Sequence, residues 1–217
     1  MTVLAIDTSA ECASLVLLES DGRLTEAAID SPDGHSYRLF GELQSLLRRA
    51  NIRLEQIDCF AASAGPGSFT GVRVALAAVK GLATALNKPM AAVSTLQALA
   101  WFGETPLRAV VADARRGDTY AGLYNAALEP IRPEVVTRLE PWLASFVAIA
   151  PGGVEIITAN PAHLASHGDL GFKVRVIAPD NLGRAVAHLA ARQLVDPAVT
   201  DANYVRRADA EMNWVDR

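Results

Sequence analysis

The feature that most constrains this chain is a glycine-rich turn between two apolar segments. Residues 59–64 are small and apolar, which is typical of a strand buried on both of its faces. The turn reads Gly65-Pro66-Gly67-Ser68-Phe69-Thr70-Gly71. A long apolar helix is predicted to follow it, from about Gly71 to Leu86, and Asn87-Lys88-Pro89 should end that helix. The segment therefore predicts a buried strand that turns sharply into a buried helix.

The glycines match neither of the common phosphate-binding loops. A nucleoside-triphosphatase loop needs lysine and a hydroxyl residue directly after its last glycine, and here Val72 and Arg73 stand there. A dinucleotide loop needs G-x-G-x-x-G, and the spacing here is one residue too long. The amides of residues 68–70 could still bind an anion at the start of the helix. The alternative, which we favour, is a tight turn in which Ser68 or Thr70 caps the helix.

The helix after the turn has only one narrow polar stripe. That stripe contains Arg73, Ala77, Lys80 and Thr84, and the other residues are Val, Leu, Ala or Gly. A helix on the outside of a small domain should have a broader polar face, so we expect a partner chain to cover it. The alternative is a central helix enclosed within one chain. Small residues would let a second helix approach closely, namely Ala75, Ala78, Gly81 and Ala85.

The first half of the chain has the element order of a ribonuclease H-like unit. Three short strands open it, predicted over residues 3–6, 12–18 and 24–29. A helix then presents an apolar face formed by Leu39, Phe40, Leu43, Leu46, Leu47 and Ala50. After the strand, turn and helix described above, a strand over 90–93 and a helix that ends at Trp101 complete the unit.

A second unit with many strands begins after residue 103. Strands are predicted over 107–112, 119–124, 154–158 and 174–177, and helices over 141–148, from Pro161, and over 182–194. We expect an α/β fold of two ribonuclease H-like lobes, residues 1–103 and 104–217, each with a mixed sheet flanked by helices. The last helix and the tail are expected to pack back on the first lobe.

Composition bounds the partners and the location. The 217 residues are 51% hydrophobic, which can fill a sizeable core, yet no run approaches the roughly 20 apolar residues of a membrane span. No leader peptide is evident, so we expect a cytoplasmic protein with no membrane partner. A net charge of −4 argues against holding nucleic acid by bulk electrostatics alone. Cys12 and Cys59 lie far apart, without zinc-ligand spacing.

Two further motifs suggest chemistry. His163 and His167 have the H-x-x-x-H spacing of zinc proteases, but Leu164 replaces the required glutamate, so we predict no metal site. Asp7-Thr8-Ser9 and Asp113 each follow a predicted strand, where a phosphoryl transferase would place a metal-organising carboxylate and phosphate-facing hydroxyls. The alternative is that these are turns whose side chains bond local amides.

Taken together, these motifs resemble the bacterial TsaB (YeaZ) family over nearly the whole chain. The resemblance is carried by Asp7-Thr8-Ser9, His35-Ser36, residues 65–73, Asp113-Ala114-Arg115 with Tyr120, and Tyr204-Val205-Arg206. It implies the two-lobed fold of actin, Hsp70 and sugar kinases, the actin-like ATPase (ASKHA) fold. It also implies a role in forming threonylcarbamoyladenosine next to the anticodon of tRNAs that read codons beginning with A, together with the catalytic paralogue TsaD and the ATPase TsaE.

The resemblance implies that this chain is not an enzyme. In TsaD, two metal-binding histidines occupy the positions where Thr95 and Leu99 stand here. The chain is therefore expected to bind and activate TsaD with TsaE, to pair with itself when TsaD is absent, and to reach tRNA only through the complex. We expect no cofactor of its own, with ATP or ADP only at a shared subunit interface. Ala159-Asn160-Pro161 departs from the glycine-containing turn expected near an adenosine site, which argues further against nucleotide binding.

Two sets of residues follow as candidates. The predicted partner interface lies on the two helices of the first lobe and comprises Leu39, Leu43, Leu46, Val72, Arg73, Leu76, Val79, Leu82 and Leu86. The candidate nucleotide-binding residues are Asp7, Thr8, Ser9 and Asp113. The second set belongs to the alternative that the chain is an actin-like phosphotransferase or ATPase. A zinc peptidase is a third, weaker alternative.

Overall fold

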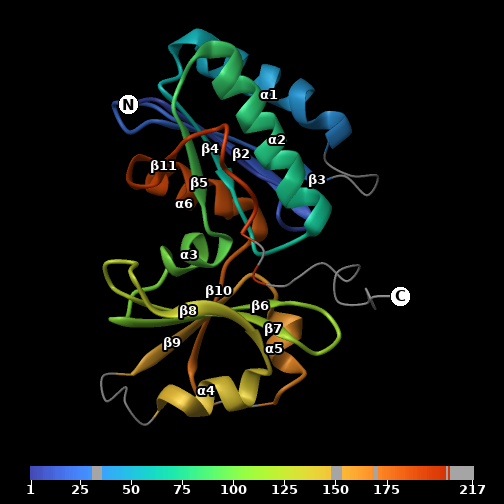
Figure 1. Ribbon diagram of the computed structural model, residues 1–217, viewed down its shortest axis with the longest axis vertical. Coiled ribbons are helices and arrows are strands. Elements are labelled where there is room, and N and C mark those ends of the chain that lie inside the picture. Colours follow the sequence, from blue (N-terminus) through green and yellow to red (C-terminus); the bar gives the residue numbers. More distant parts are fainter. Residues whose placement is uncertain (31–35, 148–152, 169–170, 204, 206–217) are drawn as a thin grey trace.

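The computed structural model describes residues 1–30, 36–147, 153–168, 171–203 and 205. His35, Tyr204 and Arg206, which contribute to the family resemblance, lie outside the described residues. The described chain forms two sheets, one above the other in Figure 1, with helices on their faces.

The first sheet has the strand order β11-β5-β4-β1-β2-β3. Its strands are β1 (Val3–Asp7), β2 (Cys12–Leu18), β3 (Leu24–Asp30), β4 (Cys59–Ser63), β5 (Met90–Val93) and β11 (Leu194–Val195). β1, β2 and β3 form an antiparallel meander, whereas β4 and β5 run parallel to β1. The strands expected over residues 3–6, 12–18, 24–29, 59–64 and 90–93 are therefore confirmed. β4 is fully buried, as its small apolar residues predict.

Helices cover both faces of this sheet. On one face lie α1 (Ser36–Ala50) and α2 (Phe69–Leu86), which share a core with the sheet side chains Leu4, Ile6, Leu15, Leu17 and Phe60. On the other face lie α6 (Leu182–Leu189) and α3 (Thr95–Ala100). The actual α2 begins two residues before the predicted start, because Ser68 caps it.

The second sheet has the strand order β10-β9-β6-β7-β8. Its strands are β6 (Leu107–Asp113), β7 (Thr119–Asn125), β8 (Pro130–Thr137), β9 (Val154–Thr158) and β10 (Lys173–Val176). Its helices are α4 (Leu139–Val147) and α5 (Pro161–Ala165), and short 3-10 turns occur at Leu54–Gln56, Pro179–Asn181 and Ala190–Arg192. α4 packs its Trp142, Leu143 and Phe146 against this sheet.

α3 lies between the two sheets and joins their cores (Figure 1). Its Leu96 and Leu99 belong to one cluster with Val110 and Ile157 of the second sheet. α6 and β11 come after the second sheet in sequence but pack on the first sheet, where β11 pairs with β5. The boundary at residue 103 stays a prediction.

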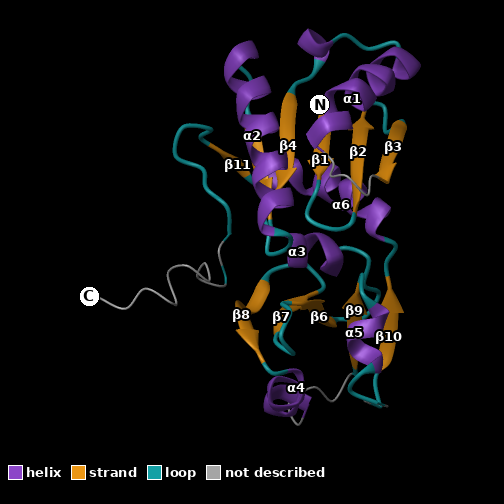
Figure 2. Cartoon of the chain, turned by 90° about the vertical axis from the view of Figure 1, so that its right-hand side faces the viewer, coloured by secondary structure: helices purple, strands orange, loops and turns teal. Residues whose placement is uncertain are grey.

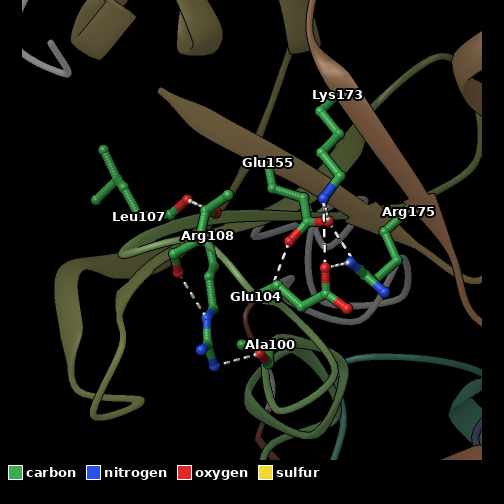
Figure 3. Close-up of polar contacts among 8 residues, drawn as sticks. Ala100, Glu104, Leu107, Arg108, Glu155, Lys173 and Arg175 are labelled. Carbon is green, nitrogen blue, oxygen red and sulfur yellow. Dashed lines mark hydrogen bonds and ion pairs between the residues drawn. The ribbon is translucent and has the colours of Figure 1, made fainter. Parts of the chain in front are cut away.

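A charged cluster holds β9 and β10 against the segment after α3 (Figure 3). Glu155 of β9 is fully buried; it accepts a hydrogen bond from the Glu104 amide at 2.9 Å and one from Arg175 Nε at 2.7 Å. Burial acts to raise the pKa of Glu155, but these two hydrogen bonds and the charges of Arg175 and Lys173 together outweigh it and lower that pKa. Arg108 donates to the carbonyl of Ala100 at 3.0 Å, at the end of α3. The cluster therefore ties α3 to the second sheet.

Two elements differ from the sequence-based expectation. No strand was predicted over Pro130–Thr137, which contains prolines at 130 and 133 that cannot donate to a sheet. β8 tolerates them as the edge strand of its sheet, with irregular pairing to β7. A single helix was expected over 182–194, but α6 ends at Leu189, a 3-10 turn follows, and Leu194 starts β11.

Candidate functional site

The carboxyl end of β1 meets the glycine turn in the interior of the first lobe. Asp7 ends the strand, and its side chain is fully buried. Its Oδ1 accepts a hydrogen bond from the Ser63 hydroxyl and another from the Ser9 amide, at 3.1 Å. Asp7 thereby joins the ends of β1 and β4, the strand that leads into the turn. The sequence left two roles open for Asp7: a carboxylate that organises a metal, or a turn residue that bonds local amides. The hydrogen bond from the Ser9 amide is the contact that the second role predicts.

The glycine turn lies directly on the chain that follows Asp7. The Thr8 hydroxyl, which is fully buried, donates to the Gly71 carbonyl at 2.5 Å, and the Ser68 amide donates to the Ser9 carbonyl at 2.8 Å. A Cβ atom on Gly67 would lie 2.8 Å from the Ser9 carbonyl oxygen, and one on Gly71 only 1.8 Å from that of Thr8. Gly67 and Gly71 are therefore glycines because backbone meets backbone.

These contacts bear on the nucleotide-binding alternative for the first lobe, which stays a prediction. Asp7 and Thr8 expose no surface, and Ser9 is only 6% exposed. In this conformation a phosphate group therefore cannot reach the Thr8 hydroxyl, which already bonds the glycine turn. The physical reason is that the turn itself occupies the end of β1.

Ser68 caps α2, as the favoured reading of the turn predicts. Its side chain accepts a hydrogen bond from the Gly71 amide at 3.3 Å, and the Val72 amide bonds the Ser68 carbonyl at 2.8 Å. The Ser68 amide, one of those suggested for an anion, is already used by Ser9. The amides of Ser68, Gly71 and Val72 are thus satisfied within the chain.

Asp113 lies in the second lobe, at the end of β6, beside His163, the first histidine of the H-x-x-x-H motif. Its carboxylate accepts from the Arg115 amide at 2.6 Å and lies 3.8 Å from His163 Nδ1. His163 Nε2 is 2.8 Å from the hydroxyl of the buried Thr119, and His167 pairs with Glu140. Burial lowers the pKa of His163, and Asp113 opposes this shift. The histidines therefore fasten α5 to the second sheet and to α4.

The described residues contain no group of three or more His, Cys, Asp or Glu side chains that could hold a metal ion. Thr95 and Leu99, which stand where TsaD is expected to have histidines, are 6% and 1% exposed. The Thr95 amide donates to the Gly65 carbonyl at 2.8 Å, and Leu99 lies in the core between the sheets. These two positions serve packing.

The outer face of α2 carries a ridge of mostly small side chains, which we call the α2 ridge. It consists of residues four apart on the helix that are all exposed, namely Phe69, Arg73, Ala77, Gly81 and Ala85. Phe69 is 48% exposed, and the Arg73 guanidinium lies over its ring at 3.7 Å from the centroid. α2 is long and apolar enough to cross a membrane by length and composition alone, but 39% of it is buried inside this chain.

The predicted partner interface needs a correction. Six of its nine residues are at most 5% exposed and form the core under the two helices; they are Leu39, Leu43, Leu46, Val72, Leu76 and Val79. They cannot contact a second chain because they already pack on the sheet. Arg73 is exposed, and Leu82 and Leu86 are half-buried. On α1, the exposed apolar side chains are instead Tyr37, at 86%, and Phe40, at 55%.

Comparison with known proteins identifies relatives with the same fold. A model of the family described as TsaD, tRNA N6-adenosine threonylcarbamoyltransferase, matches residues 30–159. A Bacillus subtilis protein named tRNA threonylcarbamoyladenosine biosynthesis protein TsaB is 37% identical over 148 residues, which are 66% of this chain and 65% of that protein. The match thus spans slightly less than two thirds of that relative.

Solved structures include relatives of the same kind. YeaZ from Pseudomonas aeruginosa is 28% identical, with a TM-score of 0.76, over 94% of this chain and 99% of that one. A more distant structure is component A of the (R)-2-hydroxyglutaryl-CoA dehydratase of Acidaminococcus fermentans. It is 9% identical, with a TM-score of 0.54, over 88% of this chain and 98% of that one. This likeness concerns only the fold, which is the actin-like fold. With a matching family model and relatives named TsaB and YeaZ, this chain belongs to the TsaB (YeaZ) family.

Proposed function

We propose that this chain is a non-catalytic subunit for the formation of threonylcarbamoyladenosine in tRNA, and that it acts by binding a TsaD subunit. The observation that carries the proposal is the exposed α2 ridge. A monomeric soluble protein rarely exposes so apolar a helix face, and such faces mark contacts with other proteins. Membership of the TsaB family supports TsaD as the partner in this proposal.

The shape of the ridge suits a second helix. Side chains four residues apart form the ridges that interdigitate when two helices pack. Ala77, Gly81 and Ala85 would allow the two backbones to come close, and a Cβ on Gly81 would meet nothing within 4 Å in this chain. Phe69 and Arg73, at the start of the ridge, are of residue types that often anchor interfaces. Tyr37 and Phe40 of α1 extend the same apolar surface in the proposal.

The interior of the chain supports a role without catalysis. The carboxylate of Asp7 and the hydroxyl of Thr8 are buried and hydrogen-bonded within the first lobe. In the proposal TsaD carries out the transfer, TsaE hydrolyses ATP, and any nucleotide sits at a subunit boundary. The tRNA is reached through the complex.

A reconstitution tests the proposed function. TsaD, TsaE, unmodified tRNA and the precursor of the threonylcarbamoyl group are combined with and without this chain, and modified adenosine is measured. We expect modification only when the chain is present. Equal modification without it would show that the proposed function is wrong.

A pair of matched variants tests the surface. Ala77→Glu adds a carboxylate to the middle of the ridge, and Ala144→Glu makes the same change at an exposed position of α4, in the second lobe. An unpaired charge in an interface should weaken TsaD binding by roughly 30-fold or more, since central interface residues contribute about 2 kcal/mol or more. The control should bind like the unaltered chain. Calorimetry with TsaD measures both, and full affinity of the Ala77→Glu protein would refute the surface assignment.

A further inference from the structure

The segment after β11 runs from the first sheet down to the junction of the two lobes. Figure 2 shows it leaving β11 and descending beside the first lobe to the level of β8. Its turns are held locally, because Asp196 accepts hydrogen bonds from the Ala198 amide at 2.8 Å and from the Thr200 hydroxyl at 2.5 Å. We call residues 196–203 the strap.

The last residue of the strap bonds both lobes. The Asn203 amide donates to the Ala64 carbonyl at 2.7 Å, at the start of the glycine turn. Its side-chain amide donates to Glu134 Oε2 at 2.6 Å, on β8 of the second sheet. One residue thus bridges two parts of the chain that belong to different sheets.

Glu134 is fixed by two further donors. The hydroxyl of the buried Tyr124 donates to Glu134 Oε1 at 2.5 Å, and the Ser94 hydroxyl donates to the same oxygen. Burial and then the Glu134 carboxylate raise the pKa of Tyr124, so its hydroxyl remains a donor. Ser94 also caps α3 by accepting from the Gln97 amide at 3.2 Å. The carboxylate therefore has a set position toward Asn203.

The strap also touches the glycine turn directly. A Cβ on Gly65 would lie 3.3 Å from the Asn203 carbonyl oxygen, and Gly65 has a φ of +94°, which favours glycine. The Gly65 carbonyl accepts from the Thr95 amide at 2.8 Å. The start of the glycine turn therefore lies between the strap and α3.

The rest of the strap packs loosely. Two open cavities lie beside it, and both are lined by Asn203 and Ser94. The cavity of about 520 Å³ is also lined by other residues of the strap, and the cavity of about 580 Å³ by residues of β8. Val199 is 80% exposed. With so little apolar surface buried, the hydrogen bonds of Asn203 must supply much of the local stability.

We propose that Asn203 and Glu134 form a latch, through which the C-terminal strap couples the second lobe to the glycine turn that starts α2. With the latch closed, the turn is held from both sides. With the latch open, the strap leaves the lobe junction and the turn gains freedom. The inference goes beyond the proposed function, because it concerns contacts within one chain and is tested without a partner.

An exchange of donor and acceptor tests the latch. Asn203→Asp keeps the shape but places a carboxylate against Glu134, which should open the latch. In the Asn203→Asp, Glu134→Gln double variant, the glutamine amide donates to the new carboxylate while its oxygen still accepts from Tyr124 and Ser94. The bond is thus restored with its direction reversed.

Hydrogen–deuterium exchange by mass spectrometry is the readout, on peptides that cover the strap, the glycine turn and β1. In Asn203→Asp we expect about tenfold faster exchange in the strap and the turn, with β1 unchanged. The reason is that a lost hydrogen bond to a charged group should raise the local opening equilibrium by about tenfold or more. The double variant and the control Val199→Ala should exchange like the unaltered chain. Unchanged exchange in Asn203→Asp, failure of the double variant to restore protection, or faster exchange that includes β1 would each overturn the latch.

Discussion

Replacing Gly71 with alanine should destabilise this protein, although the residue lies in the first turn of a helix. Helix propensity alone favours alanine over glycine by about 0.5–1 kcal/mol. The structure predicts the opposite sign, because the new Cβ would lie 1.8 Å from the Thr8 carbonyl oxygen. That oxygen belongs to the backbone of the buried segment after β1, so it cannot move away as the end of a flexible side chain could.

The size of the loss follows from what has to move. Relieving the clash requires the start of α2 and the end of β1 to separate by more than 1 Å, an overpacking strain of about 1–3 kcal/mol. The same shift breaks the buried bond from the Thr8 hydroxyl to the Gly71 carbonyl, at a further cost of about 1–2 kcal/mol. After subtraction of the gain in helix propensity, the free energy of unfolding should fall by about 1–4 kcal/mol.

Gly81→Ala is the matched control in the same helix. A Cβ there meets nothing within 4 Å, so only helix propensity acts, and the variant should be more stable by about 0.5–1 kcal/mol. Urea unfolding of the isolated chain, at one protein concentration, measures both variants. The midpoint should fall by roughly 1 M for Gly71→Ala and rise slightly for Gly81→Ala. If Gly71→Ala proved as stable as the unaltered chain, the packing of the turn on β1 described here would be wrong.

Two other predictions concern titrating side chains. Glu155→Gln should lower stability at pH 7 by about 1–3 kcal/mol. Because the pKa of Glu155 is lower in the folded state than its ordinary value of 4.5, its contribution is present above that pH and lost as the pH falls, so urea midpoints of chain and variant should converge in acid. Burial lowers the pKa of His163 below 6.5, so the unfolded chain binds the proton more readily and stability should fall as the pH drops through that value. His163→Gln should make the midpoint less dependent on pH between about 7.5 and 5; an unchanged slope would contradict the buried neutral histidine.

Much of the first lobe could be predicted because its signals are local. Turn residues separate the strands of the meander, and the glycine turn and Asn87 bracket α2. β8 could not be found this way, since its prolines are acceptable only at a sheet edge, and the position of a strand in its sheet is not a local property. β11 has two residues and pairs with β5, about a hundred positions earlier in the sequence.

The partner surface stays a prediction, but most of the side chains predicted for it are buried within this chain. Periodicity shows which positions of a helix are apolar and says nothing about what covers them. Most large apolar residues of α1 and α2, such as Leu43 and Val79, pack on the sheet, and mostly small ones remain outside on α2. The sequence places Phe40 on the same apolar face as Leu43 and Leu47, and only the structure shows that its side chain is 55% exposed.

The two halves of the glycine turn have different roles, and this bears on how the chain works. Its second half fixes the start of α2 to β1 through Thr8 and Ser9, so the ridge has a set direction relative to the sheet. Its first half, at Ala64 and Gly65, receives the strap and α3. Along the chain, a displacement of the strap can therefore reach α2 through residues 66–68, the short link between these halves. Because the second half is bonded within the buried interior, opening the latch should alter the mobility of the turn more than the direction of α2 itself.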